Sequence, residues 1–435
     1  MIAKTKQIQI DKSLLVELPV LDASVPDYLY VTTQNGRCAK AELQVKVGDK
    51  VNYGQRIGTR FGGFFEQPMF SPCSGEIVAI EKHLHRSGKL VDFVKIKNDH
   101  EDRLDSSIVT RSDEEIKALT QADVVKIVKD CALVGLGGSS FPTYVKLGTK
   151  EKINTVLLNG IECEPLLQSD HRLMMENAED IMEGILILEQ IFHLKDVRIC
   201  IKKKYTQIQK HLEEVITSKY PNSGVTVAPL GNYYPQGWEL EMIRNATGIA
   251  LNPGELPMKH GILNFNVATV VGIRDAVKYN MPVMNRYVTI QGDGIVHPAH
   301  LRARVGSLVT DLIGLCGGYK NPEIAKFIFA GGPMMGSSLP SDDLVCTRCV
   351  TGIFVLNERA VEENPCIRCG SCVLSCPAHL EPVLIMDAYK SMDREMIKAL
   401  NPLRCVECGL CTYSCTSGIR VLDWVRRAKI VAKLP

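Results

Sequence analysis

The sequence lacks a long hydrophobic run. The most apolar stretch, residues 181–194, is interrupted by Glu183, Glu189 and Gln190, whereas a membrane-spanning helix needs about 20 consecutive apolar residues. The first residues, MIAKTKQ, also lack the apolar core of a signal peptide. We therefore expect no direct membrane span, which leaves association with an integral membrane partner open.

The sequence also lacks an excess of either charge. Its 435 residues carry 51 basic and 49 acidic side chains, a net charge of +2, so there is no electrostatic case for a nucleic-acid partner. With 45% hydrophobic residues, a chain of this length can bury several cores, and we expect about three to five domains. The 16 cysteines would suggest disulfides in an oxidising compartment, but the spacing of eight of them indicates another use.

Two cysteine runs near the C-terminus share one spacing. CIRCGSCVLSC covers residues 366–376 and CVECGLCTYSC covers residues 405–415, so C-x2-C-x2-C-x3-C occurs twice. Four thiolates at this spacing bind a [4Fe–4S] cluster, and in paired runs the fourth cysteine ligates the other cluster. A zinc site favours two C-x2-C pairs separated by a longer loop. The predicted ligands are Cys366, Cys369, Cys372 and Cys415 for one cluster, and Cys405, Cys408, Cys411 and Cys376 for the other.

The first hundred residues contain short segments in which apolar and polar residues alternate. VKVGDKVNYGQRIG (45–58) and SPCSGEIVAI (71–80) read as strands separated by turns, and they resemble the two halves of a lipoyl-type barrel-sandwich. The connecting hairpin, FGGFFE at 61–66, lacks the lysine that a carrier domain would modify. We interpret this module as structural or as a docking element. Phe64 and Phe65 either contact a partner or pack against the neighbouring domain.

Residues 121–275 alternate between helical and strand patterns. Helices are predicted at 124–134, 173–194 and 206–219, with strands at 154–158, 197–201 and 225–228. Strands separated by helices of this length indicate a mostly parallel sheet with helices on both faces. Ligands of such sheets bind at the carboxyl ends of the strands.

The last third divides into two parts. Residues 287–356 are rich in strands and glycine, with one helix at 308–316, which suggests a small grasp-type α+β domain. The cysteine runs follow, between helices predicted at 386–400 and 421–433. We expect a multidomain α/β protein with an N-terminal segment (1–37), a barrel-sandwich (38–105), a Rossmann-like parallel α/β domain (113–278), a β-grasp domain of SLBB type (282–358) and a helical dicluster ferredoxin domain (361–435).

A glycine-rich loop, GLGGSSFPTYVK, spans residues 135–146. Glycines allow backbone N–H groups to approach a phosphate or a ribityl chain closely, and the following lysine adds a counter-charge. The loop is neither a Walker A motif nor a G-x-G-x-x-G fingerprint, and by itself it is as consistent with a plain tight turn. Three further motifs follow in order, NGIECEP (159–165), YPQGWE (234–239) and NVAT (266–269).

Together these motifs resemble the flavin and NADH site of the 51-kDa-type subunit of respiratory complex I. With the barrel-sandwich, the grasp-type domain and two cluster runs, the chain resembles the C subunit of the Rnf complex, an ion-translocating ferredoxin:NAD oxidoreductase. The resemblance covers about residues 40–430. It departs from the family pattern at Ser140, where glycine is usual, and at Ile161, where the complex I version has an aspartate.

The resemblance implies cofactors and roles. FMN and NAD(H) join the two [4Fe–4S] clusters, because a flavin converts the two electrons of a hydride into the single electrons that a cluster carries. Gly135, Gly137, Gly138 and Lys146 would hold FMN, and Asn159, Asn266 and Thr269 would hydrogen-bond the flavin or its ribityl chain. Phe141 would stack on the adenine of NADH, and Glu164 and Glu239 would line the nicotinamide side. The implied cofactor-binding residues are Gly135, Gly137, Gly138, Phe141, Lys146, Asn159, Glu162, Glu164, Tyr234, Gly237, Glu239, Asn266 and Thr269.

Three functions remain open at this point. The first is the NADH-facing peripheral subunit of an Rnf-type pump on the cytoplasmic face of the membrane, with integral membrane and ferredoxin-like subunits as partners. The second is a cytoplasmic paralogue that passes electrons to a cobalamin or amino-acid reductase, and the third is a non-enzymatic ferredoxin-like relay. Cys346 and Cys349 form an additional C-x2-C pair, which is a dithiol, half of a zinc site or two ordinary thiols.

Overall fold

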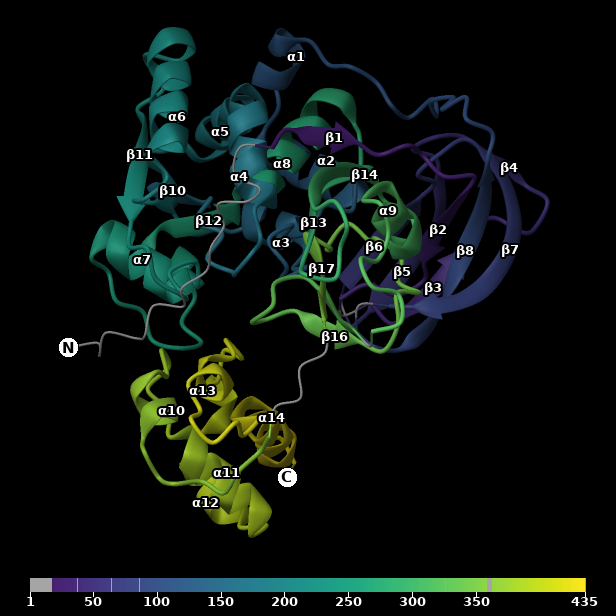
Figure 1. The fold of residues 1–435 in the computed structure, drawn as a ribbon. Helices are drawn as coiled ribbons and strands as arrows, with labels where there is room; N and C mark the ends of the chain where they lie inside the picture. The colour runs from purple at the N-terminus through teal and green to yellow at the C-terminus, as the bar shows by residue number, and fades with distance from the viewer. Residues whose placement is uncertain are drawn as a thin grey trace.

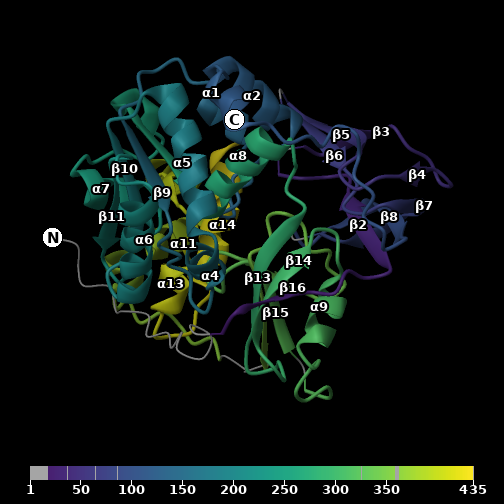
Figure 2. The same cartoon turned by 90° about the horizontal axis from the view of Figure 1, so that it is seen from above.

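The computed structural model describes residues 18–36, 38–63, 65–85, 87–324, 326–357 and 362–434. Their strands form four sheets, and the cysteine runs follow in a group of short helices. Figure 1 shows the N-terminal strands on one side, the helix-covered parallel sheet on the other, the mixed sheet between them and the C-terminal helices beneath; Figure 2 shows the same units from above.

The N-terminal strands form two facing antiparallel sheets. Alternate residues of both sheets point inward, and Leu29, Ile57, Met69, Ile77 and Ile96 fill the core between them. The hairpin between β5 and β6 carries Phe65, which is 4% exposed, while Phe64 lies outside the described residues. One sheet has the order β2-β8-β7-β4 and the other β3-β5-β6, with bounds β2 Tyr28–Thr32, β3 Lys40–Leu43, β4 Lys50–Val51, β5 Arg56–Gly62, β6 Phe65–Phe70, β7 Gly75–Leu84 and β8 Leu90–Asn98.

Two short strands lie within the segment expected to precede the barrel-sandwich. β2 pairs antiparallel with β8, so it belongs to the barrel-sandwich although it lies before residue 38. β1 (Val20–Asp22) pairs parallel with β14 of the mixed sheet. The N-terminal part of the described chain therefore joins two of the sheets.

The central unit is a fully parallel sheet in the order β11-β10-β9-β12. Val156 and Leu158 of β9 face the helices α4, α5, α6 and α8, whereas Leu157 faces α7. Helices therefore cover both faces, as the sequence predicts. The elements are α1 Asp113–Lys117, α2 Gln121–Asp130, α3 Thr143–Leu147, β9 Thr155–Asn159, α4 Ser169–Glu176, α5 Ala178–Phe192, β10 Asp196–Lys202, α6 Thr206–Lys219, β11 Val225–Leu230, α7 Glu239–Thr247, the 3-10 helix η1 Pro257–His260, β12 Ile262–Asn266 and α8 Val267–Tyr279.

Two long helices predicted from the sequence are each two shorter helices. The segment predicted as one helix at 173–194 lies in α4 and α5, which Asn177 separates with a non-helical backbone. The segment 386–400 lies in α11 and α12 because Met392 adopts a left-handed conformation and Asp393 caps the second helix through Met396 N–H at 2.9 Å. The helix predicted at 124–134 ends at Asp130, since Ala132 is also left-handed.

The third unit is a mixed six-stranded sheet in the order β1-β14-β13-β17-β15-β16. β13 pairs antiparallel with β14 and parallel with β17, and α9 contributes Val309, Leu312 and Ile313 to the core of this unit. Its elements are β13 Asn285–Gln291, β14 Ala299–Arg304, α9 Val309–Leu315, β15 Lys326–Ala330, β16 Ser337–Leu339 and β17 Gly352–Asn357.

The C-terminal unit consists of short helices around a small core that includes several cysteines. Its elements are α10 Ser371–Leu374, α11 Pro382–Lys390, α12 Arg394–Ala399, the 3-10 helix η2 Pro402–Arg404, α13 Leu410–Tyr413 and α14 Val421–Ala432. In the part of the chain that the structure describes, no helix has the length and hydrophobicity needed to span a membrane.

Candidate functional site: a nucleotide-type loop above a parallel sheet, next to two groups of cysteines

The glycine-rich loop crosses the carboxyl end of the parallel sheet, beside the ends of β9 and β12. The backbone N–H of Leu136 donates to Thr269 Oγ1 at 2.9 Å, which fastens the loop to the first turn of α8. A Cβ at position 137 would lie 3.0 Å from the Cβ of Asn266, and Gly138 has φ +107° with open space where its side chain would be. Glycine at both positions therefore brings the loop backbone close to the sheet and leaves room above it.

Two asparagines end adjacent strands at this edge. Asn159 Nδ2 donates to the carbonyl of Gly237 at 2.9 Å. Asn266 caps α8 by accepting from Ala268 N–H at 3.0 Å, and its Nδ2 donates to Asp170 Oδ2 at 2.5 Å. The two amides thus hold the loop that contains Gly237 and the start of α4 against the strand ends.

Lys146 and Glu239 approach this edge from α3 and α7. Lys146 Nζ donates to the carbonyl of Asn264 at 2.9 Å and lies 3.7 Å from Glu239 Oε1. Burial lowers the pKa of Lys146, and the Glu239 carboxylate opposes that shift. Glu239 keeps 40% of its side-chain surface exposed, so it can still contact a ligand.

Glu162 has a structural position. Its carboxylate accepts from the backbone N–H groups of Asp170 at 2.9 Å and His171 at 3.3 Å, at the N-terminus of α4. A carboxylate there satisfies N–H groups that have no partner within the helix and interacts favourably with the helix dipole. Glu162 therefore orients the segment that follows β9.

Glu164 binds a loop of another unit. Its two carboxylate oxygens accept from the backbone N–H groups of Met334 and Met335, both at 2.9 Å. These residues lie in the GGPMMG loop (331–336) of the mixed-sheet unit. The structure therefore places Glu164 at a contact between two units, whereas the sequence predicts a position beside the nicotinamide.

Tyr234 reaches the C-terminal helices. It is 4% exposed, and its hydroxyl donates to the carbonyl of Cys408 at 2.7 Å. Cys163, Met334 and Leu410 pack around this contact. The motif that contains Tyr234 thus connects the parallel-sheet unit directly to a predicted cluster ligand.

Phe141 lies at the end of the glycine-rich loop and is partly exposed. Its ring centroid lies 6.1 Å from that of Phe65, with the two planes at 79°. Of the two alternatives for the hairpin of the barrel-sandwich, packing against the neighbouring domain is therefore the one that Phe65 adopts. The exposed part of the Phe141 ring remains available to a ligand.

The loop and the sheet edge fit FMN. The open space above Gly138 and the close approach of Gly137 to Asn266 form a cradle that a Cβ would fill, and glycines there let a phosphate or ribityl chain approach the loop backbone closely. At this edge of the sheet the structure brings together the glycine-rich loop, Asn159, Asn266, Lys146 and Glu239. Four of the sequence-predicted residues make other contacts, namely Glu162 with α4, Glu164 with the loop at 331–336, Thr269 with the glycine-rich loop and Tyr234 with Cys408.

The first group of cysteines surrounds a cavity of about 30 Å³. The cavity is lined by Cys366, Cys369 and Cys372 of the first run together with Cys415 of the second run, and by Val383 and Met386 of α11. This is the crossed ligand set that the spacing predicts. Cys369 is exposed, so this group lies at the surface.

The second group lies deeper. Burial raises the pKa of the Cys411 thiol, and negative charge on Cys408, Cys405 and Cys376 raises it further, which places the fourth cysteine of the first run beside the second run. Cys408 and Cys411 are each 8% exposed, and burial raises the pKa of Cys408 to about 12.

Cys346 and Cys349 are both buried, and they lie in different cores. Cys349 Sγ is 2.9 Å from Ser140 Oγ, and burial raises the pKa of Cys346 to about 12. Around this pair, within the described residues, no three His, Cys, Asp or Glu side chains are grouped closely enough to bind a single metal ion. The pair is therefore placed as two ordinary buried thiols.

Sequence reasoning missed several contacts that shape the site. Arg286 Nη2 donates to the carbonyl of Leu136 at 3.0 Å, and Lys202 Nζ donates to the carbonyl of Glu162 at 3.0 Å. Cys163 stands within the NGIECEP motif, yet nothing in the motif indicates that its neighbours include Cys408. These contacts join strands and loops distant in sequence, which no local pattern records.

Comparisons with known proteins agree with the division of the chain into a barrel-sandwich, a parallel-sheet unit and a C-terminal unit with the cysteine runs. Residues 7–101 match the family described as RnfC barrel sandwich hybrid domain, residues 128–275 the Nuo51 FMN-binding domain and residues 360–416 the 4Fe-4S dicluster domain. The fold also resembles that of a chain of an NAD+-reducing [NiFe]-hydrogenase in the H2-reduced state, with a TM-score of 0.50 at 14% identity, over 75% of this chain and 65% of that one.

Similar proteins extend over most of the chain. The C subunit of the proton-translocating ferredoxin:NAD(+) oxidoreductase complex of Clostridium ljungdahlii is 31% identical over 379 residues, which is 86% of this chain and 81% of the relative. The corresponding C subunit of the Na(+)-translocating complex of Acetobacterium woodii is 32% identical over 381 residues, which is 86% of this chain and 84% of the relative. The C subunit of the ion-translocating oxidoreductase complex of Rhodobacter capsulatus is 32% identical over 378 residues, which is 85% of this chain and 71% of the relative.

The resemblance inferred from the sequence is therefore confirmed at high coverage. The chain belongs to the RnfC family, the C subunits of ion-translocating ferredoxin:NAD(+) oxidoreductase complexes.

Proposed function

We propose that this protein is the electron-transfer subunit of an Rnf-type complex that exchanges electrons between NAD(H), FMN and two [4Fe–4S] clusters. Bound FMN supplies the conversion between hydride transfer and one-electron transfer. The single observation that carries the proposal is the contact between Tyr234 and the carbonyl of Cys408, because it brings the FMN-type unit against one of the two cysteine groups.

The residues of this chain hold the flavin in place. The glycine-rich loop presents its backbone N–H groups, Thr269 fixes that loop, and Asn159 and Asn266 line the sheet edge below. Lys146 adds positive charge at the same edge. Glu239 is the carboxylate left to face the nicotinamide, since Glu164 is bound to the loop at 331–336.

The burial of the two cysteine groups supports an order of electron transfer. The group with Cys408 lies against Tyr234 and is buried, whereas the group with Cys369 reaches the surface. In our proposal the inner cluster (Cys376, Cys405, Cys408, Cys411) exchanges electrons with the flavin, and the outer cluster (Cys366, Cys369, Cys372, Cys415) exchanges them with the partner.

The remaining units have supporting roles. The parallel pair of β13 with β17 and the helix α9 support a β-grasp domain of SLBB type over residues 282–358. The barrel-sandwich, extended to include β2, and the expected domains at 113–278 and 361–435 complete the proposed domain organisation. We place the protein peripherally at the cytoplasmic face of the membrane, held by integral membrane and ferredoxin-like subunits.

Paired serine variants test the proposed order. In Cys369→Ser, NADH should still reduce the flavin and the inner cluster, as followed by absorbance and electron paramagnetic resonance. In Cys408→Ser, NADH should reduce the flavin while the outer cluster stays oxidised. Rapid reduction of the outer cluster in Cys408→Ser would refute the order, and absence of flavin from both variants and from wild type would refute the function.

A further inference from the structure

Two arginines are buried where the barrel-sandwich, the glycine-rich loop and the mixed-sheet unit meet. Arg60 of β5 is 5% exposed, and Arg348, just before β17, is 8% exposed. Arg60 Nε donates to the carbonyl of Thr32 at 2.8 Å. Arg348 donates to the carbonyl of Ala132 at 2.6 Å and to Gln67 Oε1 at 3.3 Å. All of these acceptors are neutral.

The two positive charges have no carboxylate partner within the described part of the chain. The titratable groups that act on the two arginines are the thiols of Cys38 and Cys349 and, for Arg60, Arg348, and no carboxylate is among them. Burial and the charge of Arg348 lower the pKa of Arg60 to about 9, and burial also lowers the pKa of Arg348. A guanidinium nevertheless keeps its proton at neutral pH. Burial also raises the pKa of the nearby Cys38 thiol, which therefore supplies no negative charge. Unpaired buried charge is costly, and here two like charges lie together.

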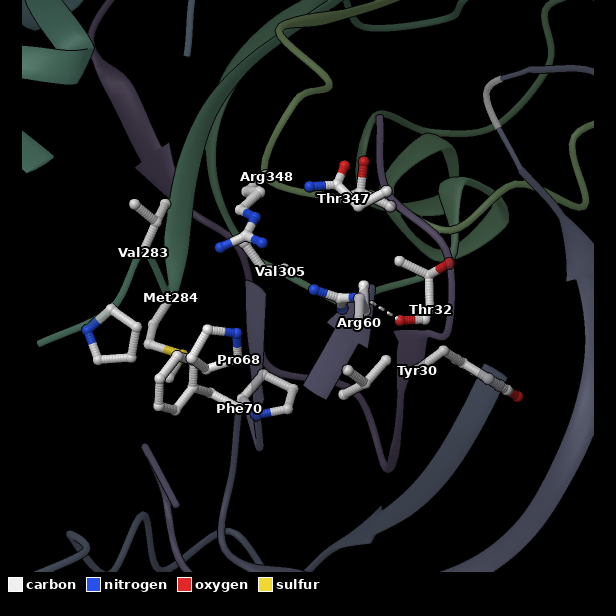
Figure 3. Close-up of a pocket in the computed structure, with 14 residues that line it drawn as sticks. Tyr30, Thr32, Arg60, Pro68, Phe70, Val283, Met284, Val305, Thr347 and Arg348 are labelled. Carbon is white, nitrogen blue, oxygen red and sulfur yellow. Dashed lines mark hydrogen bonds between the residues drawn. The ribbon is translucent and has the colours of Figure 1, made fainter. Parts of the chain in front are cut away.

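A cavity of about 50 Å³ lies between them. Figure 3 shows both guanidinium groups extending into the space above Pro68 and Phe70. The hydroxyl of Thr347, which is 5% exposed, also lines the cavity and has no hydrogen-bond partner among the described residues. A site for one water needs roughly 10–15 Å³, so the cavity has room for an ion with a water molecule.

The donors of this cavity suit an anion. A guanidinium carries five N–H donors, of which Arg60 uses one and Arg348 two within the described residues. The facing wall is formed by Pro68, Phe70 and Met284, which offer no side-chain donors. Such a half-apolar site favours a small, weakly hydrated, singly charged ion over a multiply charged oxyanion that needs donors on every side.

We propose that a small monovalent inorganic anion of chloride size binds between Arg60 and Arg348 and accepts a hydrogen bond from Thr347. Its single negative charge offsets one of the two buried positive charges and reduces the repulsion between them. Because Arg348 contacts both Gln67 of the barrel-sandwich and Ala132 next to the glycine-rich loop, the anion also fixes the position of these units relative to one another.

Thermal unfolding of the full-length holoprotein tests the site. Tm is measured in sodium chloride and in sodium gluconate at equal ionic strength, because gluconate is too large for the cavity. Wild type and the matched control Arg56→Met, altered at an exposed arginine of the same strand, should gain Tm with the logarithm of the chloride concentration. Arg60→Met should show no gain, and a gain equal to that of wild type would overturn the proposal.

Bromide supplies a second measurement that does not depend on a variant. Crystals of wild type grown or soaked in bromide should show an anomalous peak between the two guanidinium groups, even if Arg60→Met fails to fold. Absence of a peak overturns the proposal. A peak combined with no chloride effect on the Tm of wild type identifies an adventitious ion only, which also overturns it.

Discussion

Replacing Glu164 by alanine separates its two assignments, as a contact between units and as a nucleotide-binding residue. The carboxylate accepts two charge-assisted hydrogen bonds, each at 2.9 Å, from Met334 and Met335. A hydrogen bond to a charged group contributes about 1.5–3 kcal/mol, and the site is partly exposed, so we expect a loss of about 3 kcal/mol. For a cooperative unit of roughly 150–250 residues this lowers Tm by roughly 6–12 °C.

The same contact can be broken from its other side. A Cβ at Gly332 would lie 2.2 Å from Glu164 Oε2, so Gly332→Ala should lower Tm in the same way although it changes no carboxylate. Differential scanning fluorimetry of the holoprotein gives Tm, and NADH-dependent dye reduction gives KM. We expect both variants to lose Tm with an unchanged KM for NADH.

Glu239→Gln is the matched control for this experiment. Its carboxylate is 40% exposed and 3.7 Å from Lys146, an ion pair that contributes about 0–1 kcal/mol. We therefore expect little change in Tm and a raised KM. The reasoning is refuted if Glu164→Ala keeps the Tm of wild type and raises the KM for NADH as Glu239→Gln does.

Four further outcomes follow from the site. Anaerobically prepared protein should hold about eight irons per chain, and Cys369→Ser and Cys408→Ser should each lose about half of them by iron assay; full retention in both would contradict the ligand sets. Gly138→Val should abolish FMN binding and keep the cluster spectra, because Gly138 has φ +107°, and bound flavin at the wild-type ratio would show that the loop does not hold it. Dye reduction should be faster with NADH than with NADPH, because the negative charge of Glu239 in the nucleotide site disfavours a ligand that carries an additional phosphate; equal rates would remove that role. Glu189→Gln should raise Tm at pH 8 by roughly 2–4 °C, because burial raises the pKa of this carboxyl from 4.5 to about 7. The stabilising protonated form is lost as pH rises through that value, at a cost of about 1 kcal/mol after solvent screening. The Tm values of wild type and variant should converge near pH 5, and a Tm difference independent of pH would contradict this assignment.

The features that could be predicted from the sequence are those set by local spacing. The spacing of the two cysteine runs predicted which thiols lie together, because a loop of fixed length decides which of them can meet, and the structure brings Cys415 to the first run. The alternation of helical and strand patterns predicted the parallel sheet, and in the structure Asn159 and Asn266 end neighbouring strands of that sheet.

The features that could not be predicted depend on contacts between units. A glutamate in a recognisable motif looks the same whether it faces a nucleotide or, as Glu164 does, the backbone of a loop 170 residues later. Likewise, Tyr234 looks like a ligand contact until its hydroxyl is found on Cys408. The predicted helix lengths were wrong where a single residue, such as Asn177 or Met392, leaves the helical conformation. No proline or glycine marks these positions in the sequence.

The contact between Tyr234 and Cys408 has a consequence for the assembly of the protein in the cell. Once the C-terminal helices have docked, Cys408 and Cys411 are covered, while Cys369 still faces solvent. A scaffold that delivers preformed iron–sulfur clusters can then reach only the outer group. We therefore expect maturation in a fixed sequence, with the inner cluster inserted before the helices dock and the outer cluster afterwards. In an oxygen-damaged molecule, the outer cluster could be replaced in place, whereas repair of the inner one would require the units to separate.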